Sequence, residues 1–197
     1  SQTEVTIDTP NPSQSAEPES KPSPAASTPS RAGTATGIGD SVMLGARSTL
    51  RSTIPGIKID AAVARYPGAF IGRIKKIRAA GLLADTVVLH PGTNGVIPES
   101  MLRQMLDLLD DRERVVVVND DVPRSWNDAN NDVIARVVPD FPNAVIADWK
   151  SVSKGHPEYF VSDGIHLTAA GARAYANLIK KTARLSNASP SPTPSTQ

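Results

Sequence analysis

Apolar residues in the central part of the chain occur in short runs, separated by stretches with helical spacing. The runs at 86–89 and 115–118 are uninterrupted, which is typical of strands buried on both faces of a parallel sheet. We expect five strands, at 36–40, 57–63, 85–90, 114–119 and 144–148. We expect helices at 43–53, 69–80, 99–110, 127–137 and 169–184. This alternation predicts an α/β fold, a three-layer α/β/α sandwich around a five-stranded parallel sheet.

The two ends of the chain differ in composition from the middle. Residues 1–34 are rich in Pro, Ser, Thr and Glu and contain no Leu and no aromatic residue, and residues 186–197 are similar. Such segments bury too little apolar surface to offset the entropy lost on ordering. We therefore expect a disordered linker at 1–34, one folded domain at 35–185 and a disordered tail at 186–197. The linker is either an ordinary disordered end or a stalk that could extend roughly 100 Å, at about 3.1 Å per residue.

Composition excludes several classes of protein. The net charge is +1 and no basic cluster stands out, which argues against nucleic acid as a partner. The absence of cysteine excludes disulfides and cysteine nucleophiles. No apolar run is long enough to span a membrane, so any membrane attachment would lie outside these residues. The three histidines are scattered along the sequence, so we expect no metal. We also expect no cofactor, and we expect the protein to be a monomer. Because the chain begins with Ser1 rather than Met, we expect a fragment or a processed form.

Polar residues follow four of the five predicted strands, where each strand ends. Ser41 follows the first strand, in Gly39-Asp40-Ser41, and Asn94 follows the third, in 91–95. The segment 120–124 follows the fourth strand, and a loop ending in 163–168 follows the fifth. Ligands bind at this edge of parallel α/β sheets. The sequence therefore predicts that the chemistry lies at the carboxyl ends of the strands.

Three of these residues are candidates for a nucleophile, a base and its orienting partner. Ser41 lies at a predicted strand-to-helix turn, which exposes a hydroxyl beside backbone N–H groups. Asp163 precedes His166 by three residues and can orient its imidazole, as in a Ser-His-Asp triad. Asp148 is a competing orienter, less favoured because its distance from His166 is not set by sequence. The alternative without chemistry is a tight turn in which Asp40 or Ser41 caps a helix, and a loop in which Asp163 caps a turn.

The other polar candidates have equally plain structural explanations. Asn94 could donate its side-chain amide to an oxyanion, with the Ser41 backbone N–H as a second donor, or it is simply a turn residue between two glycines. His90 ends a buried strand, and we expect a hydrogen-bonded structural role for it. His156 is expected in a loop. Thr168 is expected to cap the last helix.

Three segments together resemble a known family. Gly39-Asp40-Ser41, Gly92-Thr93-Asn94 and Asp163-Gly164-Ile165-His166 resemble the first, third and fifth sequence blocks of the SGNH (GDSL-like) hydrolases. Within that superfamily, the chain is most similar to the extracellular domain of peptidoglycan O-acetyltransferases, which is fused to a multi-pass membrane acyltransferase domain. The closer resemblance rests on segments 39–44, 90–95, 122–126 and 163–168. It covers about residues 36 to 184.

The resemblance implies roles for individual residues. Ser41 would be the nucleophile, His166 the base and Asp163 its partner, while Asn94 and the Ser41 backbone N–H would form the oxyanion hole. The residues expected to line the substrate site are Gly92, Arg124 and Trp126. Two departures concern the oxyanion hole. Gly95 follows Asn94 where relatives often have Asp, and Ala64 stands where relatives often have Gly, so the contribution of this second block stays open.

The resemblance also implies a reaction. An acetyl group would pass through an acyl-serine to the 6-hydroxyl of N-acetylmuramic acid in peptidoglycan, with an esterase side activity. The acetyl donor would come from an N-terminal membrane domain absent from this chain, on the outer face of the cell membrane or in the cell wall of a Gram-positive bacterium. The modification would hinder lysozyme-type muramidases. Two alternatives stay open: a carbohydrate or lipid esterase with the same triad, and a non-catalytic cell-wall binding module.

Overall fold

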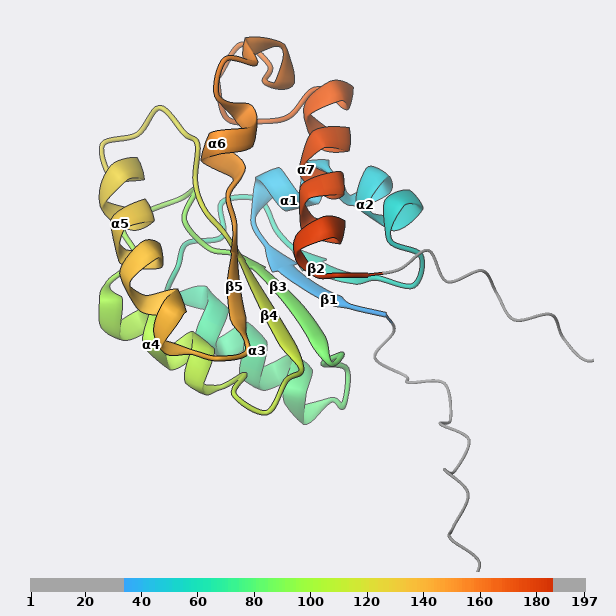
Figure 1. Cartoon of the computed structure of the whole chain (residues 1–197), viewed down its shortest axis with the longest axis vertical. Coiled ribbons are helices and arrows are strands. Elements are labelled where there is room, and N and C mark those ends of the chain that lie inside the picture. Colours follow the sequence, from blue (N-terminus) through green and yellow to red (C-terminus); the bar gives the residue numbers. More distant parts are fainter. Residues whose placement is uncertain (1–33, 186–197) are drawn as a thin grey trace, which may run out of the picture.

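The core of the protein is one sheet of five parallel strands in the order β2-β1-β3-β4-β5. A computed structural model describes residues 34–185, so the predicted tail and all of the predicted linker except Thr34 lie outside the described residues. The strands are β1 (Thr36–Gly39), β2 (Lys58–Ala61), β3 (Thr86–His90), β4 (Arg114–Val118) and β5 (Ala144–Ala147). Each lies within its predicted range, and helices cover both faces of the sheet (Figure 1). The predicted three-layer α/β/α sandwich is confirmed.

The uninterrupted apolar strands pack on both faces, as their pattern predicts. In β3 and β4, Val88 and Val116 lie opposite each other and contribute to the core on one face. Val87, Leu89 and Val117 contribute to the core on the other face. All five side chains are fully buried. Alternation along a strand thus serves two separate cores, which explains why the middle positions of both strands are apolar on either face.

Two groups of helices complete the outer layers (Figure 1). The first group packs on the core around Trp149 and comprises α1 (Ser41–Gly45), α2 (Arg47–Thr53), α6 (Trp149–Ser153) and α7 (Ala169–Thr182). The second group packs on the core around Phe70 and comprises α3 (Ala69–Ala79), α4 (Glu99–Asp107) and α5 (Asn127–Val137). Among residues 34–185, no helix combines the length and the apolar character needed to cross a membrane.

The first helical segment differs from its prediction. The continuous helix expected at 43–53 is wrong: α1 begins at Ser41, and the chain turns at Ala46 before α2. Gly45, a poor helix former, precedes this break, and the fully buried Ala46 forms the joint. The sequence analysis also missed three short helices: α6, η1 (Val138–Asp140) and η2 (Pro157–Tyr159). Short helices carry too few residues for a clear periodic pattern.

Both ends of the described chain lie at the edge of the sheet where the strands begin, which we call the amino edge. The Thr34 backbone N–H donates to the Gly56 carbonyl just before β2. At the other end, the Thr182 carbonyl closes α7 and accepts a hydrogen bond from Arg114, the first residue of β4. The opposite edge, where the strands end, is the carboxyl edge.

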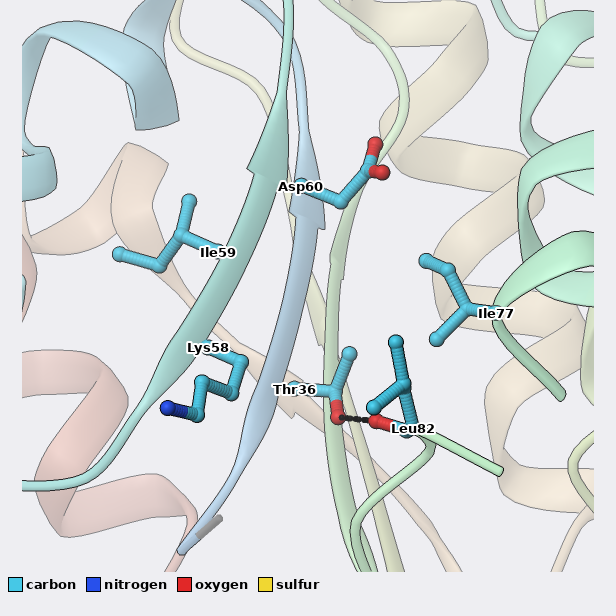
Figure 2. A pocket seen from close by; sticks show the side chains of 6 residues that line it. All are labelled: Thr36, Lys58, Ile59, Asp60, Ile77 and Leu82. Atoms are coloured by element: carbon cyan, nitrogen blue, oxygen red, sulfur yellow. Dashed lines mark hydrogen bonds between the residues drawn. The ribbon is translucent and has the colours of Figure 1, made fainter. Parts of the chain in front are cut away.

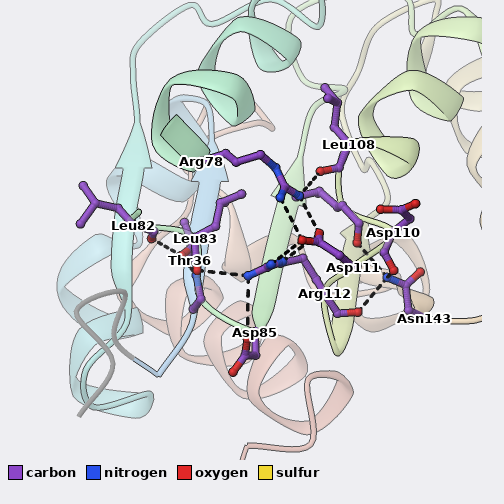
Figure 3. A network of polar contacts seen from close by, with 12 residues as sticks. Thr36, Arg78, Leu82, Leu83, Asp85, Leu108, Asp110, Asp111, Arg112 and Asn143 are labelled. Atoms are coloured by element: carbon purple, nitrogen blue, oxygen red, sulfur yellow. Dashed lines mark hydrogen bonds and ion pairs between the residues drawn. The ribbon is translucent and has the colours of Figure 1, made fainter. Parts of the chain in front are cut away.

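The amino edge carries a network of charged side chains (Figure 3). Arg78 at the end of α3 and Arg112 before β4 both donate to the carboxylate of Asp111, with shortest distances of 2.6 Å. These two hydrogen bonds hold the pKa of Asp111 well below its ordinary value. The Asp111 side chain is 45% exposed, so solvent screens these pairs and their contribution to stability is small.

A cleft of about 190 Å³ lies beside the edge strand β2 (Figure 2). It is lined by Thr36, Lys58, Ile59, Asp60, Ile77 and Leu82. The Thr36 hydroxyl donates to the Leu82 carbonyl across it. Asp60 is engaged by Arg65 and Arg73, so its carboxylate is neutralised by neighbours within the same fold. This cleft is separate from the residues that the sequence analysis selected.

Candidate active site

The turn between β1 and α1 presents Ser41 at the carboxyl edge. Asp40 is the N-cap of α1, and its side chain accepts a hydrogen bond from the Val42 backbone N–H at 2.9 Å. Ser41 is therefore the first helical residue. The preceding Gly39 lets Met43 pack close, because a Cβ at Gly39 would lie 2.5 Å from the Met43 Cβ. Capping and close packing together hold the serine in one orientation.

Ser41, His166 and Asp163 form a continuous chain of hydrogen bonds. His166 Nε2 lies 2.9 Å from Ser41 Oγ, and His166 Nδ1 lies 2.6 Å from Asp163 Oδ2. The serine and histidine are 125 residues apart in sequence. Asp148, the competing orienter, instead caps α6 and accepts a hydrogen bond from Asn119. The structure therefore places Asp163, and not Asp148, against the imidazole.

Backbone groups of the loop before α7 hold the Asp163 side chain in position for this contact. Its Oδ1 accepts hydrogen bonds from the backbone N–H groups of Ile165 and His166, at 2.8 and 2.9 Å. Gly164, which lies between Asp163 and Ile165, has a φ of +67°, a conformation that favours glycine. The hydrogen bond from the His166 side chain, followed by the two backbone hydrogen bonds, lowers the pKa of Asp163 to about 2. The carboxylate therefore stays charged beside the imidazole. Thr168, two residues after His166, caps α7 as predicted.

Asn94 lies on the loop after β3, next to the serine turn. In this structure its side-chain amide donates to the Arg65 carbonyl at 3.3 Å. Strands β1 and β3 are adjacent, with Gly39 paired to His90. The loops that carry Ser41 and Asn94 therefore begin side by side. The hydrogen bond between the Asn94 amide and the Arg65 carbonyl joins two neutral groups. A negatively charged oxygen accepts a stronger hydrogen bond and can therefore replace the carbonyl as acceptor.

Asn130 holds the Asn94 loop in place, and the sequence analysis did not identify it. It lies fully buried on α5. Its Oδ1 accepts the Ile97 N–H at 2.8 Å, and its Nδ2 donates to the Gly92 and Gly95 carbonyls. The signal was an asparagine-rich stretch, Asn127–Asn131, in an otherwise amphipathic helix. Side chains of this kind fix the backbone around a functional residue without touching a ligand.

A buried polar cluster lies beneath the serine turn and the Asn94 loop. His90 is buried at the end of β3, with Nδ1 2.9 Å from the Tyr175 hydroxyl and Nε2 3.5 Å from Asp120 Oδ1. Within the described residues, the buried side-chain atoms without a hydrogen-bond partner are Asp40 Oδ2, His90 Nε2, Thr93 Oγ1 and Asp120 Oδ1. Burial by itself would lower the pKa of His90, but the Asp120 and Asp40 carboxylates outweigh it and raise that pKa. The hydrogen bond to Tyr175 is consistent with the structural role expected for His90.

The loop after β2 carries Ala64, one of the two departures from the family pattern. Ala64 has a φ of +53°, the left-handed conformation that favours glycine. The alanine therefore keeps the backbone that a glycine would have at this position. Next to it, Arg65 donates to the Asp60 carbonyl at 2.7 Å and pairs with its carboxylate. Burial would raise the pKa of Asp60, but the hydrogen bonds from Arg73 and Arg65 outweigh that effect and lower it.

The loop after β4 contacts both the Asn94 loop and the Asp163 turn. The Trp126 indole N–H donates to the Gly92 carbonyl at 3.2 Å, and Pro123 packs against Gly164 beside the Asp163 turn. Trp126 is half-buried and Arg124 is exposed. Gly92 is buried, and a Cβ there would lie 1.7 Å from Asp120 Oδ2. This glycine is therefore placed for close packing, whereas Arg124 and Trp126 lie at the surface.

Large apolar side chains surround this edge although they face solvent. Val63 and Tyr66, on the loop after β2, are 74% and 62% exposed. Val96, on the Asn94 loop, is 61% exposed, and Val161, whose N–H donates to the His166 carbonyl, is 43% exposed. No sequence signal separated these four from core residues, because hydrophobicity alone does not report exposure.

The arrangement supports one kind of chemistry. Nε2 of His166 can accept the Ser41 proton while the Asp163 carboxylate stabilises the resulting imidazolium. His166 and Asp163 have side chains that are 47% and 43% exposed, so a large substrate can reach the triad. Among residues 34–185, no group of three or more His, Asp or Glu side chains is placed to hold a metal ion.

Comparisons with known proteins agree with this geometry. No protein-family model matches the chain. The chain is 38% identical over 142 residues to the peptidoglycan O-acetyltransferase OatA of Listeria monocytogenes. That match covers 72% of this chain but only 22% of the relative, so the chain spans about a fifth of the relative's length.

Solved structures extend the comparison. The C-terminal catalytic domain of OatA from Streptococcus pneumoniae, solved with a methylsulfonyl adduct, matches with a TM-score of 0.68 and 25% identity, covering 76% of this chain and 92% of that one. A candidate SGNH hydrolase from Slackia heliotrinireducens matches with a TM-score of 0.60 and 15% identity, over 75% of this chain and 96% of that one, which shows the fold alone. By sequence and by fold, the chain is therefore similar to the C-terminal catalytic domain of the peptidoglycan O-acetyltransferase OatA, and it has the SGNH hydrolase fold.

Proposed function

We propose that residues 35–185 form a serine-dependent O-acetyltransferase domain that acetylates peptidoglycan, at the 6-hydroxyl of N-acetylmuramic acid. The observation that carries this proposal is the chain of hydrogen bonds from Ser41 through His166 to Asp163. The similarity to the Listeria and Streptococcus proteins, which are named for this activity, supports the choice of substrate.

The first half of the reaction loads the serine. His166 Nε2 takes the proton of Ser41 while Oγ attacks the carbonyl carbon of an acetyl donor. The negative charge on the tetrahedral oxygen is stabilised by the Ser41 backbone N–H and by the Asn94 amide, which exchanges its hydrogen bond to the Arg65 carbonyl for one to the oxyanion. The donor's leaving group then departs with the proton from His166. An acetyl-serine ester results.

The second half transfers the acetyl group. A sugar hydroxyl attacks the acetyl carbonyl and gives its proton to His166. The new ester bond forms as the bond to Ser41 breaks, and His166 returns the proton to Oγ. Water can follow the same path, which yields acetate and accounts for an esterase side activity. The exposure of His166 and Asp163 supports a polymeric acceptor, because a hydroxyl on a long glycan can approach an open triad.

The proposal extends to the setting of the domain. In a peptidoglycan-modifying enzyme, the acetyl donor would come from a membrane acyltransferase domain that precedes this chain. The soluble domain would then act on the outer face of the cell membrane, or in the wall, of a Gram-positive bacterium. The linker at 1–34 would serve as a stalk. The fact that the relative is more than four times the length covered here is consistent with such an additional domain.

An intact-mass experiment tests the proposal. The protein is mixed briefly with an activated acetyl ester such as p-nitrophenyl acetate and quenched in acid, together with Ser41→Ala and His166→Ala variants. We expect one acetyl adduct that maps to Ser41 and is missing from the Ser41 variant. Ser52→Ala, which removes an exposed serine on α2, is the matched control and should keep the adduct.

The acceptor is tested in the same reaction. Adding chitooligosaccharide or purified muropeptides should discharge the acetyl-serine faster than water does and yield acetylated sugar. Discharge by water alone would instead identify an esterase. If neither an adduct nor ester turnover is seen, the triad is not catalytic, and a cell-wall binding module becomes the better explanation.

A further inference from the structure

The exposed ring of Tyr66 has no role in the mechanism above, although it lies at the edge of the sheet that carries the triad. Tyrosine rings usually bury most of their surface, yet this one is 62% exposed. Val63 on the same loop and Val96 on the Asn94 loop are exposed as well. Apolar surface grouped in this way beside a site is typical of ligand binding.

The loop that carries Tyr66 is held firmly by its neighbours. Arg65 before it is fixed by Asp60, and its guanidinium lies over the Phe70 ring at 5.8 Å. Pro67 after it packs near Gly95. The Tyr66 ring itself lies over Gly68, where a Cβ would come within 3.0 Å of the ring edge. A ring positioned in this way loses little conformational freedom when a ligand covers it.

Strand order places Tyr66 beside the proposed nucleophile. Strand β2, which leads into its loop, pairs directly with β1, which leads to Ser41, and Ala61 is in register with Gly39. On the other side of Ser41, the loop after β4 carries Trp126. Three strand spacings separate β2 from β4, about 14 Å. The loops that carry the two aromatic residues therefore follow strands on either side of β1, which leads to Ser41, and the Asn94 loop lies between them.

We propose that Tyr66 is a sugar-stacking platform that binds a pyranose ring of the acceptor glycan, one or more units away from the sugar that is acetylated. This inference rests on the proposed function, since it assigns the acceptor a place on the same site. A pyranose ring presents a flat face of C–H groups to an aromatic ring and keeps its hydroxyls in water, which fits a half-exposed tyrosine. A protein partner fits less well, because stable interfaces need about 800 Å² on each side, more than three side chains supply.

The test measures how the acetyl-serine divides between sugar and water. With p-nitrophenyl acetate as donor and chitotetraose as acceptor, the ratio of acetylated sugar to acetate should fall about tenfold in Tyr66→Ala, equivalent to about 1.4 kcal/mol. Tyr66→Phe should keep the ratio, because the ring face remains. Leu82→Ala removes an exposed apolar side chain at the amino edge and should leave the ratio unchanged.

Acceptor length provides a second readout that a structural role would not change. The monosaccharide N-acetylglucosamine should show a smaller effect of Tyr66→Ala than chitotetraose, because a single sugar cannot occupy the acetylated position and cover the ring at the same time. An unchanged ratio in Tyr66→Ala, or an equal loss with both acceptors, would overturn the proposal.

A separate measurement distinguishes failure of this inference from failure of the proposed function. If the unaltered protein transfers no acetyl group to any sugar, the transferase assignment fails. Binding of chitotetraose to Ser41→Ala is then measured by calorimetry, with and without Tyr66→Ala. Loss of binding on removal of the ring supports the platform, whereas unchanged binding or no binding at all overturns it.

Discussion

At the scale of single residues, two aspartates near the site differ in what they contact. Asp163 bonds the imidazole of His166, whereas Asp148 caps α6 and bonds Asn119. Both accept hydrogen bonds from backbone N–H groups through Oδ1. Asparagine can accept the same hydrogen bonds, so an Asp-to-Asn change removes the charge at either position and leaves the local turn intact.

Asp163→Asn should lower kcat for acetyl transfer by about 10²–10⁴-fold, because the imidazolium loses its carboxylate partner. Asp148→Asn should change kcat less than about twofold. Circular dichroism of both variants checks that the fold is retained. A similar loss in the two variants would mean that the Asp163 contact does not carry the orienting role.

His90 makes stability depend on pH. The native protein keeps the His90 proton above the usual histidine pKa of about 6.5, so between that value and the raised pKa the folded state binds more protons than the unfolded state. Unfolding free energy should therefore be highest below about pH 6.5 and fall as pH rises, with a slope of up to about 1.4 kcal/mol per pH unit. The groups that face His90 are Asp40 after β1, Asp120 after β4 and Tyr175 on α7.

Urea unfolding at several pH values between 6 and 9 checks this expectation. His90→Gln should weaken the decline in stability across that range. His156→Gln, at an exposed loop histidine, should keep it. The same decline in all three proteins would assign it to other groups.

At the scale of elements, two helical glycines occupy opposite environments. Gly72 lies within α3, and a Cβ there would meet nothing within 4 Å. Gly171 lies in the first turns of α7, and a Cβ there would come within 2.1 Å of the Tyr159 carbonyl oxygen. Glycine in α7 thus allows η2 to approach closely, whereas glycine in α3 only adds freedom to the unfolded chain.

Gly72→Ala should therefore raise the free energy of unfolding by about 0.5–1 kcal/mol, the usual gain in an exposed helix interior. Gly171→Ala should lower it by more than about 1 kcal/mol, since backbone must move to admit the methyl group. Because η2 leads into the His166 loop, acetyl transfer should fall in the second variant only. Thermal unfolding and the transfer assay measure the two effects, and changes of the same sign would contradict this account.

Elements were predictable from sequence where one physical factor dominated. Uninterrupted apolar runs such as 115–118 are typical of buried strands, so the five strands were predicted at their observed positions along the chain. The division of the first helix was not, because Gly45 lowers helix propensity without forbidding a helix. Asp163 was favoured over Asp148 because a separation of three residues already limits the distance to His166. The Asn94–Arg65 contact joins residues 29 apart, and local spacing carries no information about it.

At the scale of the whole molecule, the charged network and the cleft of Figure 2 lie near the amino edge, and the polar cluster with the triad lies at the carboxyl edge. The length of the parallel strands separates these two edges. This separation has a practical meaning for binding. A ligand held at the cleft beside β2 would not cover Ser41, so occupancy of one edge leaves the other open.

The position of the two chain ends sets the direction in which the domain faces. The first and last parts of the described chain lie at the amino edge, behind the sheet as seen from the triad. A protein fixed to a solid support through either end would therefore turn its triad toward the surrounding solution. If the domain is tethered at this edge, as proposed above, attachment and substrate lie on opposite sides of the sheet.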